Sequence, residues 1–270
     1  MRLSVSTIAL PSFDHEPELR ALAESGIAGV EVSPSKAWPN PGLVTPGEVA
    51  TYRRMVERAG LTVVGIHSLL YDKPQLGWFK DQDTRAATMD HLVHLSNICV
   101  DLGGKSMVFG SGGARDKGPL AEIDADHWAV EFLSELAHRI QGHGTRLAIE
   151  PLAPEHTNYI HTLSHAARLV REVDRPEVRV HLDLAAAAAA QEINVESMQA
   201  VAPILAHVHV NEPDLVPLRK TGEVDHAFAG NTLKKLKYDG FCSLEQRLVS
   251  MENIMPPLKE SIKILNYYYG

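Results

Sequence analysis

The chain has 270 residues, of which 44% are hydrophobic and 22% are charged, and this composition is typical of a folded protein. Its formal net charge of −8 disfavours binding to a nucleic-acid backbone, which depends on lysine and arginine. No apolar run approaches the roughly 20 residues that a membrane-spanning helix requires. The amino-terminal segment lacks the apolar stretch of a signal peptide. We therefore expect a cytoplasmic protein whose partner is a small molecule rather than a membrane or a nucleic acid.

Short β-branched segments alternate along the chain with longer segments whose apolar residues recur at helical spacing. The strand-like segments are residues 2–7, 28–33, 61–68, 105–110, 145–151, 178–184, 205–211 and 240–246. Each is followed by a helical pattern, so the chain predicts one (β/α)8 barrel, a single domain over residues 1–270. A doubly wound sheet would alternate in the same way, but no glycine-rich phosphate motif follows the first strand.

Ionisable residues stand at the ends of four consecutive predicted strands. The fifth to the eighth strand end, in order, on Glu150, Asp183, His209 and Glu245. The carboxyl ends of barrel strands converge on the mouth where barrel enzymes keep their active sites. Because buried carboxylates are costly without a partner, three of them beside one imidazole indicate a bound cation. This oxygen-rich set suits one divalent ion, Mn²⁺ first, with Mg²⁺, Co²⁺ or Zn²⁺ as alternatives.

Structural salt bridges to Arg146, Arg179 or Arg247 would be another explanation of the same residues. Arg146 and Arg179 each stand four residues before the carboxylate of their strand, about 13 Å toward the opposite end of the barrel. This spacing favours metal ligands over ion pairs. His207 shares a strand face with His209 one step deeper, which favours a core histidine or a hydrogen-bonding partner of a ligand.

The motifs around these positions extend over essentially the whole chain. They are GVEVSPSK, VVGIHSLL, VFGSGG, AIEPL, HLDL, HVHVNEPD, GEVDHAFAGNTLKKLKYDGF and SLEQR. In these motifs the sequence resembles the sugar phosphate isomerase/epimerase family of xylose isomerase-like TIM barrels. That family includes ketose 3-epimerases, hydroxypyruvate isomerase, inosose dehydratase and, more distantly, endonuclease IV. The resemblance implies that one metal ion is bound by Glu150, Asp183, His209 and Glu245.

The resemblance also implies a reaction. In the epimerases and isomerases of that family, the metal holds the substrate oxygens and stabilises an enediolate while two glutamates move protons. By this resemblance Glu150 and Glu245 would take these two catalytic roles, one removing a proton next to the carbonyl and the other returning one. The implied function is a metal-dependent isomerase or epimerase of a ketose or related polyol carbonyl compound. Because relatives are often dimers or tetramers, a homo-oligomer is also expected.

Three positions depart from the pattern of the ketose 3-epimerases. Ala153, Ala186 and Leu215 stand where those enzymes usually have an asparagine, a histidine and an arginine. A metal-dependent dehydratase of the inosose or dehydroshikimate type therefore stays open as the alternative, since it would use the same enolate with an added acid. Two other functions fit the sequence less well. One is an enzyme like endonuclease IV, which needs three zinc ions and a basic groove, and the other is a barrel that only binds its ligand.

Replacement contacts to the substrate must then come from other polar residues near the same mouth. The candidates are Glu31, His67, Arg115, His156 and Arg247. Each has a structural alternative, such as a paired carboxylate, a core histidine or a solvated loop residue. The loop after the seventh predicted strand is long enough to act as a lid.

Overall fold

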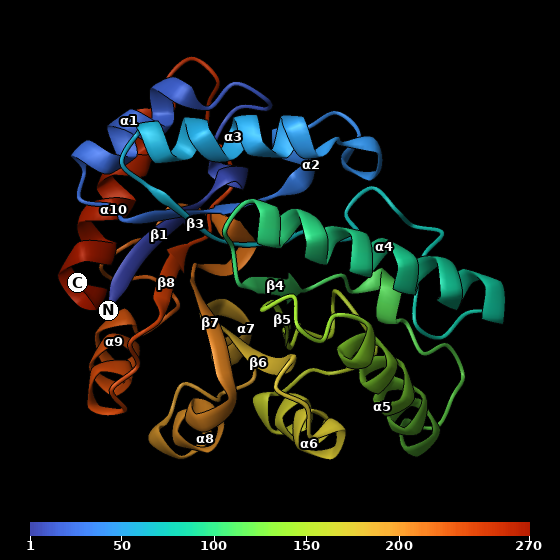
Figure 1. The fold of residues 1–270 in the computed structure, drawn as a ribbon. Coiled ribbons are helices and arrows are strands. Elements are labelled where there is room, and N and C mark those ends of the chain that lie inside the picture. The colour runs from blue at the N-terminus through green and yellow to red at the C-terminus, as the bar shows by residue number, and fades with distance from the viewer.

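Eight parallel strands close into a barrel in sequence order in the computed structural model, which describes residues 1–270 (Figure 1). The strands are β1 Arg2–Ser6, β2 Gly29–Val32, β3 Thr62–Ile66, β4 Ser106–Phe109, β5 Arg146–Ile149, β6 Val178–Asp183, β7 Leu205–Val210 and β8 Phe241–Leu244. The barrel closes where β1 pairs in parallel with β8. All eight predicted strands are present, so the predicted (β/α)8 barrel is confirmed.

Helices cover the outside of the barrel (Figure 1). They are α1 Glu16–Glu24, α2 Pro34–Ala37, α3 Pro46–Arg58, α4 Gln82–Asp101, α5 Glu122–Arg139, α6 Leu163–Val173, α7 Leu184–Ala189, α8 Val195–Val201, α9 His226–Lys235 and α10 Met255–Tyr269. Short 3-10 helices occupy Thr7–Ala9, Pro41–Leu43, Gly113–Arg115, Ala202–Ile204 and Pro213–Leu215. None of the helices combines the length and the apolar character needed to cross a membrane.

The alternation of side chains divides each strand between two environments. On β5, Leu147 and Ile149 belong to the apolar core of 66 buried residues. By the two-residue period of a strand, Arg146, Ala148 and Glu150 share the other face, which lines the barrel interior. β6 and β7 follow the same rule. One face of each strand packs against the helices, and the other face places polar side chains near the barrel axis.

Candidate metal centre and active site

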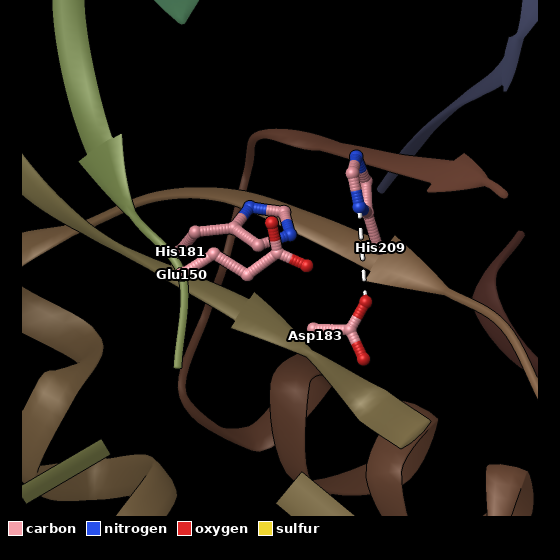
Figure 2. A group of neighbouring side chains, drawn as sticks. All are labelled: Glu150, His181, Asp183 and His209. Carbon is pink, nitrogen blue, oxygen red and sulfur yellow. Dashed lines mark ion pairs between the residues drawn. The ribbon is translucent and has the colours of Figure 1, made fainter. Parts of the chain in front are cut away.

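The carboxyl ends of β5 to β8 bring the four predicted ligands to one mouth of the barrel. Three of the predicted ligands and His181 have ligand atoms that all lie within 4.8 Å of one another (Figure 2): Glu150, His181, Asp183 and His209. Glu245 belongs to a second such group, with His67 and His209. Nδ1 of His209 lies 3.8 Å from Oδ2 of Asp183 and 3.2 Å from Oε2 of Glu245. His209 is thus the common neighbour of the carboxylates from β6 and from the end of β8.

Asp183 ends β6 and caps the amino-terminus of α7. Its Oδ1 accepts a hydrogen bond from the backbone N–H of Ala186 at 2.8 Å, and its Oδ2 accepts one from Nδ2 of Asn211 at 2.6 Å. The same nitrogen also donates a hydrogen bond to Oε2 of Glu245 at 3.1 Å, so the Asn211 amide bridges the carboxylates of Asp183 and Glu245. The alanine-rich segment Leu184–Ala189 is therefore a short helix whose first turn orients Asp183. Sequence reasoning did not single out Asn211, although its place two residues after His209 puts it on the same strand face.

Glu31 lies beneath His209, on the side away from the other carboxylates. Its carboxylate is completely buried, and Oε2 accepts a hydrogen bond from Nε2 of His209 at 2.8 Å. Nε2 of His207 lies 3.4 Å from Oε1 of the same carboxylate. A side chain in this position supports a ligand and has no open path to a substrate, so the predicted substrate contact of Glu31 is corrected to a hydrogen bond with His209.

The carboxylates of the site crowd negative charge in a buried space. Burial and the neighbouring Asp183 and Glu245 raise the pKa of Glu150 well above its usual range. Burial and Glu245 raise the pKa of Asp183 to about 6. Burial also disfavours ionised Glu245, but the adjacent His209 outweighs it and lowers the pKa of Glu245. A divalent cation among these groups would relieve the repulsion, so the donor set fits the predicted metal.

Two further histidines lie beside the predicted ligands. Nε2 of His67 lies 2.6 Å from Oγ of Ser6, and its Nδ1 lies 3.4 Å from Oε1 of Glu245, which keeps His67 a candidate for substrate contact. The ring of His181 lies 4.1 Å from that of His209, and both of its nitrogens are buried without a hydrogen-bond partner. The sequence analysis missed His181, although it stands two residues before Asp183 on the same face of β6.

The remaining predicted substrate contacts lie in different surroundings. Arg115 is completely buried, and its Nη1 donates to the backbone carbonyl oxygen of Glu150 at 2.5 Å. Burial lowers the pKa of Arg115 to about 10, against the opposite effect of Glu150. Arg115 therefore holds the backbone of Glu150 and is not open to a substrate, which corrects its predicted substrate contact. His156 and Arg247 are exposed, and neither side chain forms a hydrogen bond or an ion pair with a predicted ligand.

The fold and this site together define a TIM barrel with a carboxylate–histidine cluster at the carboxyl ends of its strands. The model of the family described as xylose isomerase-like TIM barrel matches residues 19–268. The chain belongs to this family, which confirms the resemblance seen in the sequence motifs. No curated protein sequence matches the chain.

Solved structures share the fold at low sequence identity. D-psicose 3-epimerase from Clostridium cellulolyticum H10 has a TM-score of 0.83 at 16% identity, over 100% of this chain and 99% of that one. The 3-keto-D-glucoside 4-epimerase YcjR from E. coli has a TM-score of 0.79 at 18% identity, over 99% of both chains. The IolI protein with a bound zinc atom has a TM-score of 0.76 at 17% identity, over 99% of this chain and 96% of that one. At these identities the likeness shows the fold alone.

Proposed function

We propose that the chain is a divalent-metal-dependent isomerase or epimerase of a ketose or a related polyol carbonyl compound. The observation that carries this proposal is the convergence of Asp183 and Glu245 on Nδ1 of His209, with Glu150 in the same cluster. The names of the structural neighbours, two of which are sugar epimerases, support the same chemistry.

A divalent ion held by Glu150, Asp183, His209 and Glu245 would supply positive charge where negative charge develops on a carbonyl oxygen of the substrate. Glu150 and Glu245 directly follow β5 and β8, and β6 and β7 lie between those two strands. One carboxylate removes the proton next to the carbonyl, and the other returns a proton to the resulting enediolate. Mn²⁺ is the first candidate for the ion because most donors are oxygens, and Zn²⁺ is the second because the IolI structure binds zinc.

A metal-dependent dehydratase is the second candidate, and the position of His67 favours it. This imidazole lies 3.4 Å from Glu245 and is hydrogen bonded to Ser6, so it is held in place beside a proposed base. Such a group could protonate a departing β-hydroxyl, the added acid that a dehydratase needs. The lyase would produce an enone that absorbs in the ultraviolet, whereas an isomerase would not.

Metal content tests the ligand assignment. Wild-type protein should retain close to one divalent ion per chain, and Glu150→Ala and Glu245→Ala should lose it. Glu252→Ala is the matched control, because Glu252 is an exposed glutamate in the loop after β8. Equal metal content in all four proteins would refute the ligand set.

Turnover tests the chemistry. In heavy water the manganese-loaded protein should introduce deuterium next to the carbonyl of ketoses, and Glu150→Gln or Glu245→Gln should abolish exchange while the fold is retained. Enone formation without exchange into recovered substrate would favour the dehydratase. A metal-loaded protein that neither exchanges nor dehydrates any polyol carbonyl compound would contradict both functions.

A further inference from the structure

The opposite, amino-terminal mouth of the barrel contains a cavity. Its volume is about 500 Å³, and it lies among the first residues of several strands. Four cationic side chains line it against a single carboxylate, that of Asp239: Arg2, Lys105, Arg146 and Lys237. All four are exposed at this mouth, and none of them forms an ion pair in the structure, although arginines and lysines elsewhere in the chain do. This concentration of positive charge contrasts with the net charge of −8 for the whole chain.

The fold itself fixes these cations at one place. Arg146 begins β5 and shares a strand face with Glu150, so it points to the barrel axis at the end opposite the carboxylates. The backbone N–H of Arg146 donates to the carbonyl oxygen of Lys105, which places the two residues side by side on neighbouring strands. The guanidinium of Arg2 lies 4.2 Å from the ring centroid of Phe241, which limits its freedom to leave the mouth.

Like charges gathered around one cavity, with a single carboxylate among them, favour an anion there. Burial lowers the pKa of the neighbouring Arg179, and the like charge of Arg146 lowers it further. Ser106, 6% exposed, lines the cavity, and its Oγ is buried without a hydrogen-bond partner. Leu205 and Phe241 supply apolar wall beside the cations. An anion with several acceptor oxygens could accept hydrogen bonds from more than one of these cations at once.

We propose that this amino-terminal cavity binds the phosphate group of a small molecule. A phosphate group presents several charged acceptor oxygens and can engage more than one of the cations at once, whereas a carboxylate offers only two. The volume suits a small metabolite, and the negative net charge of the chain opposes a nucleic-acid polymer. The site is separate from the metal centre and does not depend on the proposed function.

Calorimetric titration of the metal-loaded protein with inorganic phosphate, pyrophosphate and glycerol 3-phosphate tests this site, with acetate as the anion control. The double variant Lys105→Ala/Arg146→Ala should bind the phosphate compounds at least about tenfold more weakly, because each lost contact is a hydrogen bond from a charged donor. Arg58→Ala/Lys259→Ala is the matched control, since it removes two exposed positive charges from α3 and α10 and should bind as the wild type does.

Phosphate could also bind at the metal, so the titration is repeated with Glu245→Ala, which should lose the metal and keep phosphate binding. Lys237→Ala gives an independent single change at the mouth and should also weaken binding. Stronger binding of pyrophosphate or the ester than of inorganic phosphate would support a ligand that fills more of the cavity. Absence of millimolar binding, equal binding by the mouth variant and its control, or loss of binding only in Glu245→Ala would overturn the proposal.

Discussion

The imidazole of His209 is shared between two groups of carboxylates. Burial alone would raise the pKa of Glu31, but His209, His207 and His67 hold that pKa well below its usual range, so Glu31 is an ionised acceptor. The N–H of His209 is therefore directed from Nε2 to Glu31, at 2.8 Å. Burial opposes the charged form of His209, but Glu245 and Glu31 raise its pKa well above its usual value, so without a cation Nδ1 carries a proton beside Asp183 and Glu245. A metal ion would replace that proton while Glu31 keeps the ring oriented through Nε2.

Replacing Glu31 should weaken the metal centre without removing a ligand. Glu31→Gln should lower metal affinity by about 10- to 100-fold, because the partner that orients His209 loses its charge. Competition with a chelator of known affinity measures the change. Glu252→Gln, which changes an exposed glutamate in the loop after β8, should leave the affinity unchanged. Equal affinities for Glu31→Gln and the wild type would show that Glu31 does not position His209.

Gly110 leaves the space that the carboxylate of Glu150 occupies. A methyl group on Gly110 would overlap the Glu150 carboxylate, whereas one on Gly113 would meet no heavy atom within 4 Å. Gly110→Ala should therefore displace Glu150, lower metal affinity, and cost about 1–3 kcal/mol of stability through overpacking. Gly113→Ala is the control in the same loop. Metal content and chemical denaturation of both variants check this, and a Gly110→Ala protein with wild-type metal affinity would contradict the placement of Glu150.

At the scale of the elements, the strands and their last residues could be predicted, because the two-residue alternation that defines a strand also fixes which side chain ends inside the barrel. The partners of these residues could not. Glu31 and His209 are 178 positions apart, and their contact depends on the register of β2, which shifts between Val30 and Glu31. His156 and Arg247 lie outside the strands, where no period determines the direction of a side chain.

One buried carboxylate ties α5 to α6 and to the loop after β5. Oδ1 of Asp126 accepts hydrogen bonds from Tyr159 Oη and from Nε2 of His165, each at 2.8 Å. Its Oδ2 accepts one from Nη1 of Arg168 at 2.5 Å. Burial opposes ionisation of Asp126, but His165, Arg168 and Tyr159 together lower its pKa. The segment that leads away from Glu150 is therefore fastened to the helices outside the barrel.

Asp126→Asn should lower the free energy of unfolding at pH 7 by about 2 kcal/mol, because hydrogen bonds to a charged group are lost. The native pKa of Asp126 lies below that of the unfolded chain, so its contribution is complete above the unfolded value of about 3.9 and is lost as pH falls through the native value. The difference between wild type and variant should accordingly shrink below about pH 4. Denaturation at several pH values measures it, and a difference that does not change with pH would contradict an ionised Asp126.

At the scale of the whole molecule, the barrel is polar along its axis and oppositely charged at its two mouths. β5 begins on Arg146 and leads to Glu150, and β6 leads from Arg179 to Asp183. The carboxylates of one mouth meet only when β5 to β8 lie side by side in the closed barrel. An unfolded chain has no such cluster, so a metal that binds here also stabilises the entire fold.

The stabilisation of the fold by a bound metal ion should increase with pH, because the ion competes with a proton for Asp183. The pKa of Asp183 is raised to about 6 without a cation, so between the unfolded value of about 3.9 and this value the native metal-free protein binds more protons than the unfolded chain. This group therefore makes the metal-free protein less stable as pH rises from about 4 to 6. A cation reverses the effect, because it competes with that proton and binds the carboxylate more tightly at higher pH.

Saturating Mn²⁺ should thus stabilise the wild type by about 2.7 kcal/mol when the free ion is 100 times its Kd at pH 7.5, and the gain should shrink at pH 5, where Asp183 is protonated. Thermal denaturation with Mn²⁺ or with a chelator at both pH values measures the gain. Glu245→Ala should show little gain at either pH, whereas Glu252→Ala should behave as the wild type does. A gain that is equal at both pH values, or equal in Glu245→Ala and the wild type, would mean that the ion binds outside these strand ends.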